Sequence, residues 1–287
     1  MNLPANWKFA YLPYFGFKTM DQALDSISKL GFEGVELPSL ISYKTSKDLS
    51  EIIAKAKLRN LEISEVGFSQ DFITLDEERR KERVRLTKEK IQLASDCGIS
   101  IVKGLTGPYP WDKNALKLGV DLSEGTAWKL VLDSFNDFIG TCEKLGVYFA
   151  LEACFGTLTR DYYTTKELLD SVNSKYLALN MDPSHYNLYG NDVAWVVRRF
   201  GKARIKHVHL KDSVGVPRDE GRDFIFPLLG EGTIDWKSFF QALRDIGYEG
   251  FFSAEYESMN YFKNILDGDP VKTAELSLQL MKKLASM

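Results

Sequence analysis

Short apolar runs alternate with longer amphipathic segments along the whole chain. This alternation is typical of βα units that build a parallel sheet. The short runs predict eight strands, and each longer segment predicts a helix that follows one of them. The strands are expected at residues 8–12, 31–37, 61–67, 99–104, 148–152, 177–182, 205–210 and 250–255, and the helices at 19–30, 48–59 (after an N-cap at Ser46 or Lys47–Asp48), 76–97, 123–145, 165–173, 191–200, 235–246 and from Pro270 onward.

The connections between these segments predict how the units are arranged. Glycines such as Gly31, Gly98 and Gly146 close helices just before the next strand, so the helix-to-strand connections are short. The strand-to-helix connections are longer, and residues 211–233 form an insertion. A (β/α)8 barrel takes roughly 250 residues, and this chain has 287 without an interrupting linker. We therefore predict an α/β fold, a (β/α)8 TIM barrel, as a single domain over residues 1–287.

Four of the predicted strands end on side chains that can bind a metal. Glu152 follows YFAL, Asp182 follows LALNM, His209 lies near the end of IKHVHL, and Glu255 follows GFFSA. Because the carboxyl ends of barrel strands meet at one face, these four side chains are expected at one site. Side chains alternate along a strand. The faces that carry Glu152 and Asp182 hold small or polar residues, which suits the crowded interior of a barrel.

A set of two glutamates, an aspartate and a histidine suits one hard or borderline divalent ion, such as Mn, Mg, Co or Zn. The expected ligands are Glu152, Asp182, His209 and Glu255. The alternative is that these side chains only form caps and salt bridges at strand ends. That alternative is favoured for any one of them alone, and the metal interpretation depends on all four lying at the same level.

The ring order of the strands also suggests chemistry. Glu152 and Glu255 belong to strands that are three positions apart, so they are expected to face each other across the barrel mouth. Two opposed carboxylates could take a proton from a carbon and return it to the other face or to the adjacent carbon. The metal would polarise the neighbouring carbonyl and stabilise the resulting enediolate. Because a cation-bound carboxylate is a weak base, this mechanism requires one glutamate to be loosely bound.

These residues resemble those of a known family. GFEGVEL, the glutamate that ends YFALE, DPSH, HVHLKD, GEGTIDW and SAEYE are similar to motifs of the xylose isomerase-like TIM-barrel superfamily. The similarity is greatest to its sugar isomerase/epimerase branch, which includes 2-keto-myo-inositol isomerases, inosose dehydratases and ketose 3-epimerases. The resemblance covers essentially the whole chain. It implies a metal-dependent isomerase or epimerase of a small ketose, sugar or inosose, with the four ligands above and Glu152 and Glu255 as the catalytic acid/base pair.

The resemblance also implies contacts with substrate. His185 in DPSH matches a family histidine that contacts substrate oxygens, and Arg222 is the first choice for an arginine expected after the seventh strand, followed by Arg218. Ketose 3-epimerases carry a second glutamate shortly after the strand-five ligand, where this chain has Phe155 and Leu158. This departure argues against direct assignment as a ketose 3-epimerase. A dehydratase that uses the same enediolate is the close alternative.

Other polar and aromatic residues allow two interpretations each. Either Lys211 or Asp212 could bind substrate, or the residue could form a salt bridge at the rim. Trp111 could stack on a sugar ring or pack against the barrel. His207 is either a core histidine or a side chain that orients His209. Three more residues are either polar wall residues or members of buried ion pairs, namely Glu36, Glu65 and Lys103.

Composition narrows the classes of partner. The net charge is -3 with a pI of about 5.8, and no basic block suggests nucleic acid or an anionic membrane. No apolar run approaches the roughly 18 residues of a membrane span, and the N-terminus lacks the apolar region of a signal peptide. Three cysteines without CxxC spacing suit a reducing compartment. We expect a cytoplasmic protein with a small carbohydrate or cyclitol substrate, and a homo-oligomer is left open.

Two further classes of function fit the sequence less well. Endonuclease IV-type DNA repair enzymes share the barrel, but they need a trinuclear zinc site with several histidines, and this chain has three histidines in all. An acidic chain is also poorly suited to capture phosphates. A metal-bearing but inactive sugar-binding protein is the other class, and the complete ligand set argues for activity instead.

Overall fold

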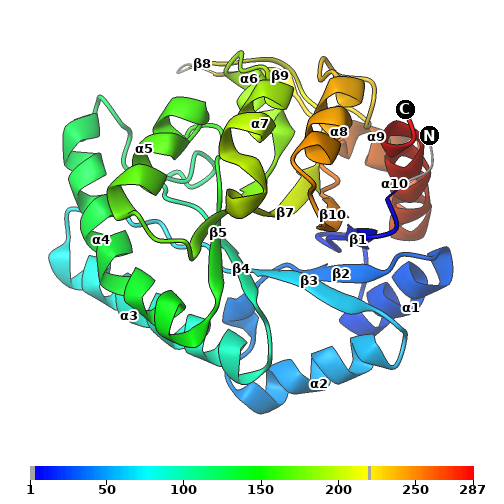
Figure 1. Ribbon diagram of the computed structural model, residues 1–287, viewed down its shortest axis with the longest axis horizontal. Coiled ribbons are helices and arrows are strands. Elements are labelled where there is room, and N and C mark those ends of the chain that lie inside the picture. The colour runs from blue at the N-terminus through cyan, green and yellow to red at the C-terminus, as the bar shows by residue number, and fades with distance from the viewer. Residues whose placement is uncertain (1–3, 219–220) are drawn as a thin grey trace.

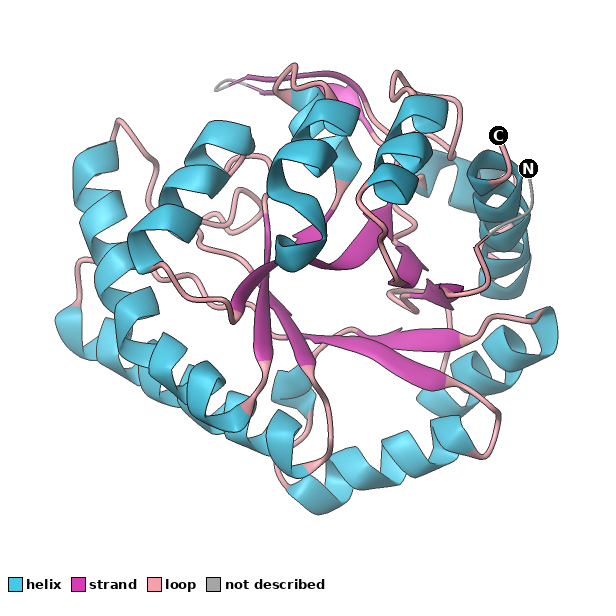
Figure 2. Cartoon of the chain, in the orientation of Figure 1, coloured by secondary structure: helices cyan, strands magenta, loops and turns pink. Residues whose placement is uncertain are grey.

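Eight parallel strands of the described chain close into a barrel, and the helices surround it (Figures 1 and 2). The computed structural model describes residues 4–218 and 221–287. The predicted (β/α)8 fold is confirmed. Around the barrel the strand order is β1-β10-β7-β6-β5-β4-β3-β2. The bounds are β1 Trp7–Tyr11, β2 Gly34–Leu37, β3 Glu62–Gly67, β4 Ile101–Gly104, β5 Tyr148–Glu152, β6 Leu177–Met181, β7 Ile205–Leu210 and β10 Gly250–Ala254.

The long helices lie close to where the hydrophobic pattern predicts them. The start of the second one differs: its N-cap is Thr45, not Ser46 or Lys47–Asp48. Thr45 Oγ1 accepts from the Asp48 backbone N–H at 3.2 Å, while the Asp48 carboxylate accepts from the Thr45 N–H at 3.0 Å, so Asp48 completes a capping box. The bounds are α1 Met20–Leu30, α2 Ser46–Lys57, α3 Glu77–Asp96, α4 Glu124–Leu145, α5 Tyr162–Val172, α7 Val193–Arg204, α8 Trp236–Asp245 and α10 Pro270–Ala285. No helix in the described ranges has the length and apolar character to cross a membrane.

Several short elements were not predicted, because they span too few residues for a periodic pattern. The expected loop 211–233 contains an antiparallel hairpin of β8 (Val214–Arg218) and β9 (Gly221–Ile225). The sixth strand ends at Met181 because Asp182 caps a new helix, whose first residue is Pro183. The other short elements are η1 Leu40–Ser42, α6 Pro183–Leu188 and α9 Met259–Asn264.

The outer face of the strands forms the apolar core under the helices. On β5, Phe149 packs against Phe135 and Phe138 of α4, with ring centroids 5.6 and 4.9 Å apart. The alternate residues face the barrel interior, where Asn180 of β6 is fully buried. This alternation leaves polar side chains no route to solvent except the open ends of the barrel, so their partners must be one another.

The aromatic contact between β5 and α4 should be a major source of stability. We expect Phe149→Ala to lower the free energy of unfolding by about 3–5 kcal/mol, because it removes a large side chain from a packed core. Tyr163→Ala is the control, since Tyr163 is 70% exposed on α5, and it should change stability by less than about 1 kcal/mol. Urea denaturation followed by circular dichroism measures both, and equal effects would contradict the role given to Phe149.

Candidate metal centre

The four predicted metal ligands all come from the carboxyl ends of β5, β6, β7 and β10. Glu152 is the last residue of β5, whereas Asp182 and Glu255 directly follow β6 and β10. The strands are staggered: Ser253 lies beside His209 in the ladder, so Glu255 is two residues nearer the mouth. The ligands therefore differ in register along their strands, yet their side chains converge.

His209 stands between the two glutamates. Its Nδ1 is 2.9 Å from Glu152 Oε1 and 3.3 Å from Glu255 Oε2. Ligand atoms of Glu152, Asp182 and Glu255 also lie within 4.8 Å of one another, together with one of His185. His209 thus contacts two of the other predicted ligands, Glu152 and Glu255, whereas the group that contains Asp182 has His185 as its histidine.

The hydrogen bonding of His209 decides which of its nitrogens faces this group. Nε2 is 2.8 Å from Glu36 Oε2. A carboxylate can only accept, so Nε2 carries a proton and Nδ1 is turned toward the glutamates. A carboxylate behind a histidine in this way is the usual arrangement for a metal-binding imidazole.

Two buried atoms of the group have charged neighbours but no well-aligned hydrogen bond within the described residues: His209 Nδ1, 2.9 Å from Glu152 Oε1, and Asp182 Oδ2, 3.0 Å from Lys211 Nζ. Buried polar atoms without partners are costly. Burial alone would lower the pKa of His209, but the Glu36 carboxylate and the other nearby glutamates raise it well above its ordinary value. Nδ1 therefore requires either a proton or a cation, and a divalent ion would replace that proton. The donor set fits a divalent metal ion.

The contacts of the two ring nitrogens of His185 differ from those of His209. Nδ1 of His185 lies 3.4 Å from the backbone N of Phe155, and its Nε2 lies 3.2 Å from Lys211 Nζ and 3.5 Å from Asp182 Oδ2. The Lys211 ammonium can only donate, so Nε2 faces one donor and one acceptor. Burial and the neighbouring Lys211 ammonium lower the pKa of His185 to about 3. The ring is therefore neutral at physiological pH, and its Nε2 lies beside the ligand group, between the Lys211 ammonium and Asp182.

Lys211 forms salt bridges, which was one of its two interpretations, and its partners are carboxylates of this group and Glu257 beside it. It is 4% exposed, and its Nζ lies 3.0 Å from Asp182 Oδ2 and 3.2 Å from Glu257 Oε2, with a further contact to Glu255 Oε2. Burial would raise the pKa of Glu255, but the charges of Lys211 and His209 bring it well below its ordinary value. Carboxyl groups still outnumber ammonium groups here, which leaves negative charge for a further cation to neutralise.

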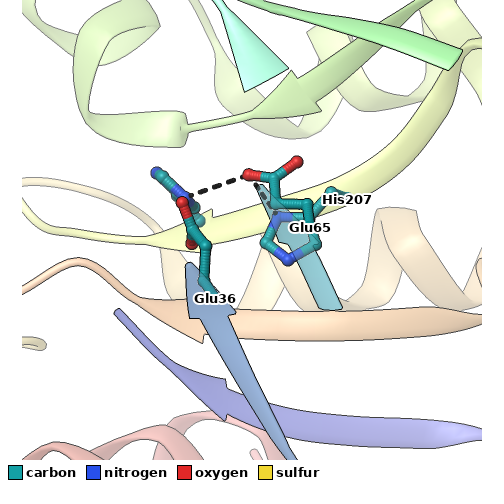
Figure 3. Close-up of side chains that lie close together, drawn as sticks. Glu36, Glu65 and His207 are labelled. Carbon is teal, nitrogen blue, oxygen red and sulfur yellow. Dashed lines mark hydrogen bonds and ion pairs between the residues drawn. The ribbon is translucent and has the colours of Figure 1, made fainter. Parts of the chain in front are cut away.

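A second polar cluster lies deeper in the barrel, where Glu36, Glu65 and His207 converge from β2, β3 and β7 (Figure 3). His207 does not hydrogen-bond His209. Its Nδ1 is 3.0 Å from Asn180 Oδ1 and 3.2 Å from Glu65 Oε1, and Asn180 in turn donates to Glu152 Oε1 at 3.3 Å. Of the two interpretations of His207, the structure supports the core histidine.

In this deeper cluster the pKa values favour a neutral Glu65 and a neutral His207 beside an ionised Glu36, whose pKa His209 and Lys103 lower despite its burial. Burial and the Glu36 charge raise the pKa of Glu65 to about 8, and burial lowers the pKa of His207 to about 3. His209 belongs to this deeper group as well, since its Nε2 is 3.5 Å from Glu65 Oε1. Two groups of the described residues could therefore hold a metal ion: one of Glu152, Asp182, His185 and Glu255, and a deeper one of Glu36, Glu65, His207 and His209.

Aromatic side chains form one wall of the mouth. Trp111 is 53% exposed and stacks on Tyr109 with ring centroids 5.2 Å apart. Phe155 lies 6.2 Å from the Trp111 ring and 5.7 Å from that of His185, and Phe224 of β9 packs on it at 4.9 Å. This aromatic wall, defined as Tyr109, Trp111, Phe155 and Phe224, runs from the surface to the ligand group.

Of the two predicted arginines, Arg218 lies apart from the ligand group, and the side chain of Arg222 is not among the described parts of the chain. The Arg218 side chain is 67% exposed and pairs with Asp223 at 2.9 Å across the β8–β9 hairpin. Arg222 lies in β9 opposite Pro217, but its side chain is outside the described part of the chain. Substrate binding by either arginine stays a prediction.

Sequence reasoning missed Asn180 and gave Asp212 an open role. Asn180 precedes Asp182 by two residues on the same strand face, so the alternation of side chains was an available signal. Asp212 is an anchor for the loop that follows β7: its Oδ2 accepts from the Gly230 and Gly232 N–H groups and from Trp236 Nε1.

The chain belongs to the xylose isomerase-like TIM barrel family, whose model matches residues 24–284. Among curated relatives, the inosose dehydratase of Geobacillus thermodenitrificans is 27% identical over 274 residues, which is 88% of each chain. That of Clostridium perfringens strain 13 is 26% identical over 285 residues, covering 92% of this chain and 91% of the relative. These relatives are named as enzymes, and this supports the prediction of an enzyme.

Solved structures share the fold at lower sequence identity. The IOLI protein with a binding zinc atom aligns with a TM-score of 0.76 and 18% identity over 97% of this chain and 98% of its own. D-psicose 3-epimerase with D-tagatose from Clostridium cellulolyticum H10 aligns with a TM-score of 0.78 and 18% identity over 97% and 99%. Both likenesses agree with the resemblance identified from the motifs.

The contact between Glu36 and His209 yields a direct test of the ligand set. We expect Glu36→Ala to weaken binding of Zn²⁺ and Mn²⁺ by about 10- to 100-fold, because the imidazole loses the partner that orients it. Competition against a fluorescent chelator measures the affinity. Glu62→Ala is the matched control, since Glu62 is exposed and pairs with Lys8 on the surface. Unchanged affinity in Glu36→Ala would contradict His209 as a ligand held by Glu36.

Proposed function

We propose that this chain is a divalent-metal-dependent enzyme that moves protons at carbon next to the carbonyl of a small polyhydroxylated ketone. The observation that carries this proposal is the position of Glu152 and Glu255. Both carboxylates approach the same nitrogen of His209, at 2.9 and 3.3 Å, from strands that are three positions apart in the ring. This arrangement suits two acid/base groups around one metal.

Glu152, Asp182, His209 and Glu255 would hold the ion, for which Mn, Mg, Co and Zn all suit the donors. The zinc in the related IOLI structure agrees with such a site. When bound, the metal would polarise the substrate carbonyl and make the adjacent C–H more acidic. The Lys211 ammonium and the His185 imidazole, which are 3.2 Å apart, then lie beside the ligands, where they could bind substrate oxygens.

The two glutamates divide the proton transfers. One carboxylate takes the proton from the carbon next to the carbonyl. In a dehydratase, the hydroxyl on the next carbon then receives a proton, its C–O bond breaks, and water leaves as a C=C bond forms. In an isomerase or epimerase, the other glutamate returns a proton to carbon instead.

Dehydration of a keto-polyol, with an inosose as the substrate class, is the form of the activity that the relatives favour. Two curated relatives covering about nine-tenths of the chain are named inosose dehydratase. Phe155, at a place where ketose 3-epimerases carry a glutamate, is part of the aromatic wall, and such a wall suits the C–H face of a ring. Isomerisation or epimerisation of a ketose is the second candidate, which the likeness to D-psicose 3-epimerase supports. A cytoplasmic location and independence from nucleic acid and membrane stay predictions.

Hydrogen exchange at carbon tests the proton transfer itself. With Mn²⁺ and an inosose or ketose panel in deuterated water, we expect deuterium to enter the carbon next to the carbonyl. Glu152→Gln and Glu255→Gln should each slow this exchange by about 10²- to 10⁴-fold, because an amide is not a general base. Glu62→Gln is the control on the exposed surface.

Nuclear magnetic resonance of the products separates the candidates. An unsaturated product that has lost water supports the dehydratase, whereas a rearranged or inverted sugar supports the isomerase or epimerase. Exchange by wild type that persists in both glutamine variants would contradict the roles of the glutamates.

The aromatic wall predicts a separate effect on substrate affinity. We expect Trp111→Ala to raise KM by about three- to ten-fold with little change in kcat, since a stacking contact contributes about 0.5–1.5 kcal/mol. Trp195→Ala is the control, because Trp195 is also partly exposed but lies on α7. Steady-state kinetics measure both variants, and an unchanged KM for Trp111→Ala would assign this residue to loop packing.

A further inference from the structure

Lys103 of β4 is a buried cation within the group of glutamates. It is 7% exposed, and its Nζ lies 3.3 Å from Glu36 Oε1, 3.4 Å from Glu152 Oε2 and 3.9 Å from Glu255 Oε1. Each of these carboxylates comes from a different strand. One ammonium group therefore joins both proposed acid/base residues to the carboxylate that orients His209.

The three glutamates divide their oxygens between Lys103 and His209. Glu152 and Glu255 turn the oxygens that Lys103 does not contact toward His209 Nδ1. Glu36 likewise turns Oε2, the oxygen that Lys103 does not contact, toward His209 Nε2. No carboxylate offers the same oxygen to both side chains. Lys103 thus faces one oxygen of each catalytic glutamate. The other oxygen faces His209, and it also accepts from Asn180 in Glu152 and contacts Lys211 in Glu255.

We propose that Lys103 is a positioning residue that acts as a fixed counter-cation: it keeps Glu152 and Glu255 as one-oxygen ligands and limits how tightly they bind the metal. This inference rests on the proposed function. A carboxylate that gives both oxygens to a cation is a poor base, and a nearby ammonium opposes a divalent ion by like-charge repulsion. Lys103 thus keeps the glutamates loosely bound and able to exchange protons.

A purely structural ion pair predicts the opposite change in metal affinity when Lys103 is removed. If Lys103 only held the glutamates in place, its removal would loosen the ligand group and weaken metal binding. If it is a counter-cation, its removal leaves the carboxylates with uncompensated charge, and metal binding becomes tighter. Lys211 differs, because it contacts Glu255 Oε2 together with Asp182 and Glu257 at the mouth, where a substrate would also reach it, whereas Lys103 contacts both Glu152 and Glu255.

The test compares Lys103→Met with wild type. We expect Zn²⁺ and Mn²⁺ to bind about ten-fold more tightly to Lys103→Met, by competition with a fluorescent chelator. Exchange of substrate hydrogen should slow at saturating metal. Lys8→Met is the matched control: Lys8 also pairs with a glutamate, Glu62 at 2.6 Å, but its side chain is 37% exposed on β1, so its metal affinity should equal that of wild type.

Two further variants separate charge from shape. Lys103→Arg keeps the charge and should retain the affinity of wild type, whereas Lys103→Gln should bind metal more tightly, as Lys103→Met does, and serves if the methionine variant does not fold. Weaker or unchanged affinity in the uncharged variants, or an equal gain in Lys103→Arg, would overturn the role of Lys103. Failure of wild type to bind either ion would instead overturn the proposed function, so the two failures are distinguishable.

Discussion

The structure depends on one constraint, which is that carboxylates buried inside a barrel must be neutralised by groups that the barrel itself supplies. An isolated buried carboxylate is very costly. Here glutamates from β2, β3 and β5, with Glu255 after β10, surround His209 and Lys103. Every one of these side chains has at least one partner of opposite charge or a changed pKa. The strand ends are held in register by this network as well as by the backbone ladder.

The same network orients side chains that are predicted to bind a metal. Glu36 directs Nδ1 of His209 toward Glu152 and Glu255, and the N-cap geometry of α6 leaves Asp182 Oδ2 turned into the same group while Oδ1 accepts from Ser184 N–H at 2.8 Å. Asp182 therefore has two roles, as a helix cap and as a predicted ligand. Because the first role already restrains its carboxylate, little ordering remains for the second.

Catalysis and metal binding place opposite demands on the two glutamates. A tightly bound metal holds its ligands and lowers their proton affinity, whereas a general base must be free to accept a proton. The buried Lys103 lies near both carboxylates, and under the proposed role it would compete with a bound ion for them. In that case the site would have a lower metal affinity but more reactive ligands.

The order of strands and helices was determined by the sequence alone, because the alternation of apolar runs and glycine caps is a local signal. So were the strand-end residues Glu152, Asp182, His209 and Glu255, since side-chain alternation and the shared carboxyl face of a barrel follow from local geometry. Tertiary structure decided what a linear pattern cannot encode: which nitrogen of His209 faces the glutamates, that Lys103 and Lys211 lie among them, and that Arg218 pairs with Asp223 on a hairpin. Those outcomes depend on distances between residues far apart in the chain, and such distances exist only once the barrel has closed.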